Sequence, residues 1–92
     1  MVRKKKMPSP DRTRIYPGSG QIVDNDNNTW SITSVATGAN VLFNKNYFTG
    51  GGGTAALEFY GGNIFGQDQA SGSWYIANVP AYLAGSSDTW SM

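Results

Sequence analysis

A short tryptophan motif occurs three times in this chain of 92 residues, and it constrains the fold more than any other feature. The copies are residues 28–32 (NTWSI), 72–76 (GSWYI) and 88–92 (DTWSM), and each contains one of the three tryptophans. Residues i and i+2 of a strand share a face, so the Trp of each copy points to the same side as the Ile or Met that follows it. Each copy therefore predicts a half-buried strand that leaves a tight turn.

The remaining sequence predicts a small all-β domain. Twelve glycines and many Asn, Ser and Thr residues disfavour helix. Turn signals separate roughly six to eight short strands at intervals of about 8–12 residues, a spacing typical of a small antiparallel sandwich or barrel. We expect residues 18–92 to form this single domain and residues 1–17 to form an extended basic arm.

The expected strands pair as hairpins. Residues 21–23 pair with 29–34, residues 41–43 with 47–48, and residues 54–60 with 63–65 across the turn Gly61-Gly62. Residues 73–77 form a further strand, and Pro80 makes residues 79–83 an irregular or edge segment. The predicted core consists of large apolar residues of these strands: Ile22, Trp30, Ile32, Leu42 or Phe43, Leu57, Phe59, Ile64, Trp74 and Ile76.

The positive charge is concentrated at the N-terminus. Residues 1–14 have a net charge of +5, whereas residues 15–92 have a net charge of −4. The basic residues of this segment, which we expect to bind an acidic protein surface, are Arg3, Lys4, Lys5, Lys6, Arg12 and Arg14. The aromatic residues lie in the acidic part, so we expect no specific nucleic-acid binding. No apolar run follows the basic residues, so we expect neither a signal peptide nor a membrane partner.

Candidate chemistry is limited because the chain contains no Cys and no His. Most carboxylates lie in predicted turns, where Asp bonds the local backbone, and Glu58 is predicted mid-strand on an outer face. We therefore expect no catalytic residue, no cofactor and no enzyme activity. Asp24, Asp26 and Asn28 match the first ligand positions of a calcium loop, but its required Gly and Glu are missing, so we expect no metal. The run Gly50–Gly53 predicts a flexible connection or a close approach of another segment.

Tyr47, Tyr60 and Tyr75, together with Glu58, are candidates for a ligand or interface platform. Exposed rings flanked by Asn, Gln and Asp are typical of small-ligand sites such as those for sugars. The same residues also suit ordinary cross-strand pairs or the interface of a homo-oligomer.

Several segments, in this order, resemble a known type of module: Ser9-Pro10-Asp11 with Thr13, then residues 21–24, 28–32, 50–53, 56–60, 62–65 and 73–75. They are similar to small Trp- and Gly-rich β modules of tailed-bacteriophage structural proteins, of decoration or fibre type, and of bacterial surface or secreted proteins. Related modules accompany glycoside hydrolases. The basic run Arg3–Lys6 is not part of that pattern, and the module stands alone here.

The resemblance and the charge pattern imply two functions. The first is an accessory structural protein of a phage particle, a capsid decoration or cement subunit whose arm and β body bind other virion proteins. Such a protein is made in the host cytoplasm and ends in the virion. The alternative is an extracellular, stand-alone carbohydrate-binding module that holds a glycan with its exposed tyrosines.

Overall fold

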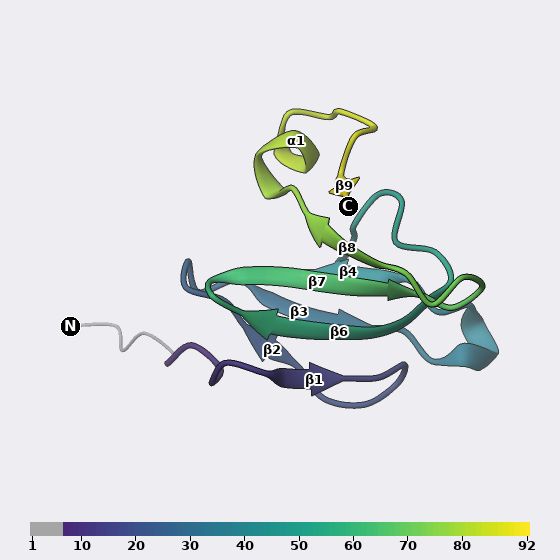
Figure 1. Ribbon diagram of the computed structural model, residues 1–92, viewed down its shortest axis with the longest axis horizontal. Coiled ribbons are helices and arrows are strands. Elements are labelled where there is room, and N and C mark those ends of the chain that lie inside the picture. Colours follow the sequence, from purple (N-terminus) through teal and green to yellow (C-terminus); the bar gives the residue numbers. More distant parts are fainter. Residues whose placement is uncertain (1–6) are drawn as a thin grey trace.

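The computed structural model describes residues 7–92, apart from the side chain of Thr37, and it is a sandwich of two antiparallel sheets (Figure 1). The five-stranded sheet has the order β1 (Thr13–Ile15), β6 (Thr54–Tyr60), β7 (Asn63–Asp68), β8 (Trp74–Ala77) and β9 (Trp90–Ser91). The four-stranded sheet has the order β2 (Ile22–Val23), β3 (Thr29–Ile32), β4 (Val41–Phe43) and β5 (Asn46–Tyr47). A 3-10 turn, η1 (Val35–Thr37), and one short helix, α1 (Val79–Leu83), complete the chain. The predicted all-β class is confirmed.

Tight turns set the pairing of the hairpins. Asn44 and Lys45 have φ of 51° and 70° between β4 and β5, and Gly61 and Gly62 have φ of 58° and 82° between β6 and β7. Two successive residues in the left-handed region match the twist of the flanking strands, and Asn and Gly adopt this conformation most readily. The three hairpins expected from the sequence are confirmed, although the second strand of the middle hairpin is Asn46–Tyr47 and not residues 47–48.

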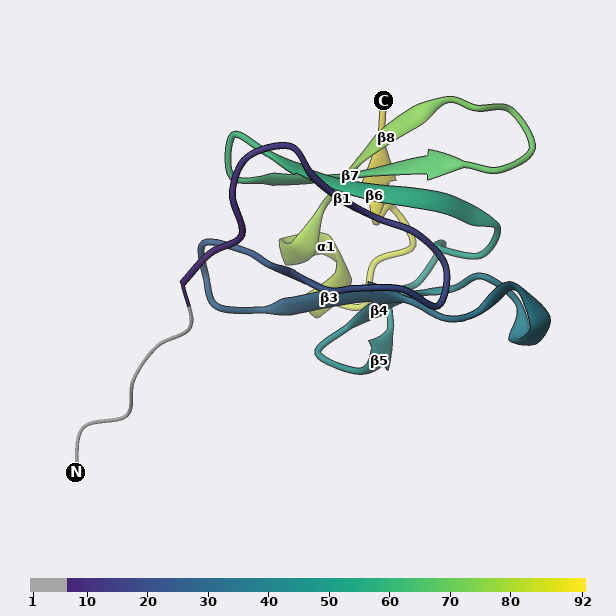
Figure 2. The same cartoon turned by 90° about the horizontal axis from the view of Figure 1, so that it is seen from below.

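An aromatic cluster fills the space between the two sheets. Trp30 is fully buried, and its ring centroid lies 5.0 Å from those of Phe43 and Phe48. Tyr82 of α1 stacks on Phe48 at 4.5 Å. Figure 2 shows the two sheets as separate layers with α1 beside the space between them. The helix therefore covers the core where the sheets leave it open.

Most of the predicted core is confirmed. The predicted residues that are buried are Ile22, Trp30, Ile32, Phe43, Leu57, Phe59 and Ile64. Ile15, Val41 and Phe48 belong to the same cluster and were not predicted.

Trp74 and Ile76 are not core residues, so their predicted position is wrong. They pair with Gln67 and Phe65 on the outer face of the five-stranded sheet and are only half-buried. The alternation of the motif correctly predicts that the two side chains share a face. It cannot specify which face, because both faces of this sheet carry large apolar residues.

The segment 79–83 is a helix, which corrects the expected irregular segment. Pro80 lies in the first turn, where its missing N–H group is tolerated. The side chain of Asn78 caps this turn by accepting a hydrogen bond from Ala81 N at 3.1 Å.

The N-terminal segment contacts the rest of the domain from Ser9 onward, before residue 17, the predicted end of the arm. Ser9 exchanges two hydrogen bonds with Val23: its N–H donates to the Val23 carbonyl at 2.8 Å, and its Oγ accepts from Val23 N at 2.9 Å. β1 then pairs with β6, and Ile15 is buried in the core. Burial of this apolar side chain explains why residues 13–15 form an edge strand.

Asp24 joins the turn between β2 and β3 to the centre of the core. Its side chain is buried, with Oδ1 accepting hydrogen bonds from the N–H groups of Asp26 and Asn28 at 2.9 and 2.8 Å. Oδ2 accepts from Trp30 Nε1 at 2.8 Å. The carboxylate therefore satisfies the single polar group of the buried indole.

We expect Asp24→Ala to lower the free energy of unfolding by about 3 kcal/mol, because it removes bonds to a charged acceptor and leaves the buried Trp30 N–H without a partner. Urea denaturation measures this change. Asp26→Ala is the matched control: its side chain is exposed, and we expect a change within about 0.5 kcal/mol. Equal effects of the two substitutions would contradict this role for Asp24.

Candidate binding surfaces

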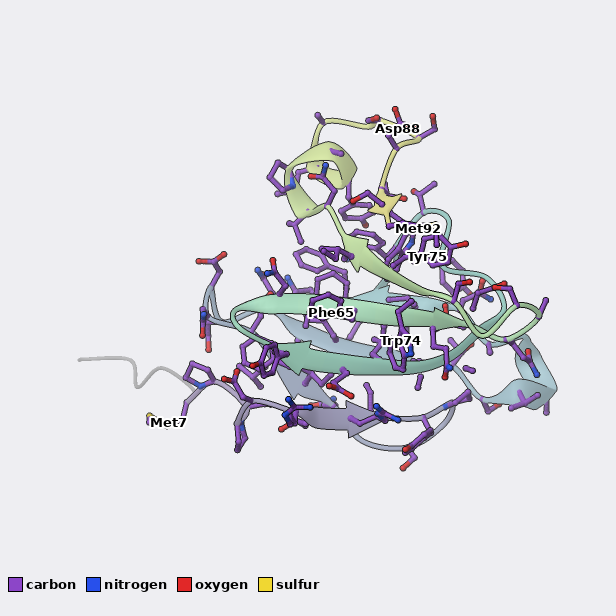
Figure 3. The ribbon with its side chains drawn as sticks, viewed as in Figure 1. Met7, Phe65, Trp74, Tyr75, Asp88 and Met92 are labelled. Atoms are coloured by element: carbon purple, nitrogen blue, oxygen red, sulfur yellow. The ribbon has the colours of Figure 1, made fainter. Side chains whose placement is uncertain are left out.

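The outer face of the five-stranded sheet displays large apolar side chains. The register aligns Glu58 of β6 with Phe65 of β7 and Ile76 of β8, and Trp74 lies on the same face two residues before Ile76. Phe65, Trp74 and Ile76 are all half-buried. Figure 3 shows Phe65 and Trp74 on the front of the sheet. We call these three residues the docking face.

Charged residues from the N-terminal segment border the docking face. Arg14 of β1 lies opposite Glu58, and its Nε and Nη2 donate to Glu58 Oε1 at 2.9 and 2.5 Å. The Arg14 guanidinium also lies 5.0 Å from the ring centroid of Trp74, a cation–π distance. The hydrogen bond to Glu58 raises the pKa of Arg14 above its ordinary value. Arg12 lies over the Tyr60 ring in the same way, at 4.9 Å.

The structure separates the tyrosines that the sequence suggested as a platform. Tyr60 faces outward on the five-stranded sheet, as expected, and is 45% exposed. Tyr75 lies on the opposite face of this sheet from Trp74, so its expected outward orientation beside Tyr60 is wrong. Tyr47 belongs to β5 in the other sheet.

The basic residues of the N-terminus also separate into two groups. Arg12 and Arg14 lie beside the docking face, whereas Arg3, Lys4, Lys5 and Lys6 lie outside the described residues. Sequence reasoning missed the docking face itself. The alternation of Phe65 and Gln67 with Ile64 and Gly66 would have indicated that β7 carries an aromatic residue on its outer side.

A cavity of about 260 Å³ lies on the inner side of the same sheet. Its lining comes from the loop before β6 and from β6, β7, β8 and β9: Gly50, Gly52, Thr54, Gly66, Asp68, Tyr75 and Trp90. We call it the glycine-lined cleft. Of the predicted platform residues, only Tyr75 belongs to it.

Two glycines hold the Trp90 ring in this cleft. A Cβ atom on Gly66 would lie 2.9 Å from Trp90 Cη2 and Cζ3, and one on Gly50 would lie 3.2 Å from Trp90 Cδ1. Phe48 contacts the ring on the core side, with centroids 5.3 Å apart. Gly50 thus fits the expectation that another segment approaches the glycine run closely. The Trp90 ring is a fixed wall of the cleft.

Two of the lining residues, Asp68 and Trp90, carry polar groups of opposite kind. Asp68 Oδ2 accepts hydrogen bonds from Ser71 N at 3.0 Å and from Ser71 Oγ at 2.7 Å, and these bonds lower the pKa of Asp68 below its ordinary value. Trp90 Nε1 is buried and has no hydrogen-bond partner among the described residues. Asp68 is therefore an ionised acceptor of the cleft, whereas the unpaired Trp90 N–H lies buried beside Gly50.

A smaller hollow of about 180 Å³ lies beside Asp24 and Asp26, the residues that match a calcium loop. Both Asp24 oxygens already accept hydrogen bonds from the turn and from Trp30. Within residues 7–92, no group of three or more His, Cys, Asp or Glu residues could hold a metal ion. This hollow is therefore built around a structural carboxylate.

No protein family, curated protein or solved structure matches this chain. In the part of the chain that the structure describes, no helix is long and apolar enough to cross a membrane.

We expect Ser71→Ala to raise the pKa of Asp68 toward its ordinary value, since the Ser71 side chain is the largest cause of the lowered pKa. An NMR titration of the carboxyl carbons measures this shift. The bond to Ser71 stabilises the turn while Asp68 is ionised, so its contribution is lost as the pH falls through the folded pKa. Ser87→Ala, in another turn, is the control, and an unchanged Asp68 titration in Ser71→Ala would contradict the assignment.

Proposed function

We propose that the protein is a non-catalytic accessory structural subunit of a phage particle, a capsid decoration or cement subunit that attaches through its docking face and basic N-terminus. The observation that carries this proposal is that Phe65, Trp74 and Ile76 lie half-buried, and so partly open to solvent, on neighbouring strands of the outer sheet face. Burying them fully against another protein would add apolar stabilisation to that of the small core of this 92-residue domain.

The composition around the docking face supports a protein partner. Interface centres are enriched in aromatic residues and Arg, and their rims are polar. Here Trp74 and Phe65 form the centre, while the Arg14–Glu58 ion pair and the Arg12–Tyr60 pair lie beside it. Arg14 also stacks against Trp74, so its guanidinium is oriented before binding and loses less conformational freedom on binding.

The charge pattern supports an acidic partner. The four basic residues 3–6 precede β1, the strand that brings Arg14 to the docking face. Their charge is not balanced within the segment, where Asp11 is the only acidic residue of positions 1–14. Attraction to an acidic shell would speed association and select the partner.

The hydrogen bonds and ion pair of three carboxylates support a role without enzyme activity. Glu58 is paired with Arg14, Asp24 accepts three hydrogen bonds, and Asp68 accepts from Ser71. A carboxylate in a structural bond is poorly placed to act as a general acid or base.

Co-sedimentation with shells from the native phage source tests this function. We expect the isolated protein to bind shells that lack this subunit, and we expect binding to weaken as salt rises. Trp74→Ala should weaken binding by at least about 2 kcal/mol, roughly 30-fold, because it removes the aromatic centre of the interface. Deleting residues 1–6 should weaken binding and reduce its salt dependence.

Tyr47→Ala is the matched control, because Tyr47 is an exposed aromatic residue of the other sheet. We expect this variant to bind like the wild type. Far-UV and near-UV circular dichroism establish that each variant is folded. Binding that survives both Trp74→Ala and high salt, or a protein that never associates with particles, would overturn the proposal.

A further inference from the structure

We infer that the glycine-lined cleft is a binding site for a single sugar ring. The site is distinct from the docking face, because Tyr75 and Gly66 lie on the opposite side of the sheet from Trp74 and Phe65. A sugar site here does not depend on the exposed tyrosines, since only Tyr75 of that set lines the cleft.

The size of the cleft limits the ligand. Its volume of about 260 Å³ lies just below the usual range for small-molecule sites, roughly 300–1,000 Å³. The space suits one ring of a monosaccharide, or the terminal ring of a longer glycan.

The walls match the apolar side of such a ring. Tyr75 and Trp90 contribute aromatic side chains, and Trp90 is held by the close approach of Gly50 and Gly66. Sugar C–H groups pack against flat aromatic surfaces, and a wall that is fixed before binding loses little freedom when the ligand enters. Side chains at the two glycine positions would displace the indole ring.

Asp68 matches the hydroxyl side of the ring. It is a hydrogen-bond acceptor that stays ionised at neutral pH, since its pKa is lowered by Ser71. A sugar hydroxyl can donate to this carboxylate. The unpartnered N–H of Trp90 is buried beside Gly50, so Trp90 contributes its ring to the wall of the cleft and not a polar contact.

The main competing ligand is an organic cation. Aromatic rings beside a carboxylate also attract quaternary ammonium groups. A quaternary ammonium group, however, has no N–H group to donate to Asp68, whereas the hydroxyl groups of a sugar ring can each donate a hydrogen bond. The directional acceptor therefore favours a neutral polyhydroxylated ring over the cation.

The test uses the three indole N–H signals in a two-dimensional ¹⁵N NMR spectrum of the full chain. Glucose, galactose, mannose and N-acetylglucosamine are titrated separately, and choline chloride is titrated in a parallel sample. We expect at least one sugar to shift the Trp90 signal saturably at millimolar concentration. The Trp30 and Trp74 signals should not move.

Two variants complete the test, since Asp68 also holds the turn at Ser71. Asp68→Ala should weaken sugar binding roughly tenfold or more, and Tyr75→Ala should weaken it without touching that turn. Tyr60→Ala, on the outer face of the same sheet, should bind the sugar like the wild type.

Three results would overturn the inference: no sugar shifts the Trp90 signal, choline shifts it more strongly than any sugar, or a sugar shifts the Trp74 signal instead. Loss of shell binding in Trp74→Ala leaves this test unaffected, because Trp74 does not line the cleft. The docking proposal and the sugar site therefore fail or succeed separately.

Discussion

The hydrogen bond from Trp30 Nε1 to the buried Asp24 carboxylate is the interaction on which the rest of the sandwich depends. Trp30 is the largest fully buried side chain, and Phe43 and Phe48 pack against it. An indole N–H that is left without a partner in the core lowers the stability of the fold. Asp24 is the partner of the Trp30 N–H, and it also accepts two hydrogen bonds from the turn between β2 and β3. One carboxylate therefore links this turn to the packing of Trp30 between the sheets.

The three copies of the tryptophan motif occupy three physical environments. Trp30 is in the core, Trp74 is on the outer face under Arg14, and Trp90 lines the cleft over Gly66. The three copies differ in their neighbours. Trp30 of the first copy bonds to Asp24, whereas the side chains of Trp74 and Trp90 lie on opposite faces of the five-stranded sheet. The first copy stabilises the fold, and the tryptophans of the other two copies are half-buried on the five-stranded sheet. This division places the proposed shell contact and the proposed sugar site on opposite faces of one sheet.

The fold class, the hairpins and most of the core could be predicted because alternation and turn chemistry are local signals. Gly61-Gly62, for example, fixes the β6–β7 register without help from distant residues. The face occupied by Trp74 could not be predicted, since it depends on which side of β7 packs against the second sheet. The cleft was missed for a related reason: Gly50, Gly66 and Trp90 are far apart in sequence, and only the strand order brings them together. Pro80 alone does not predict helix α1, because its position in the first turn becomes clear only together with the cap at Asn78.

Hydrogen–deuterium exchange of the three indole N–H groups tests the central claim, that Trp30 is locked in the core while Trp74 lies half-buried on the outer face. The account predicts that the Trp30 indole exchanges slowest, at a rate set by global unfolding, because its N–H is buried and bonded to Asp24. Trp74, on the outer face, should exchange orders of magnitude faster. Exchange of Trp30 as fast as that of Trp74 would contradict the account, because the core tryptophan would then be open to water in the native state.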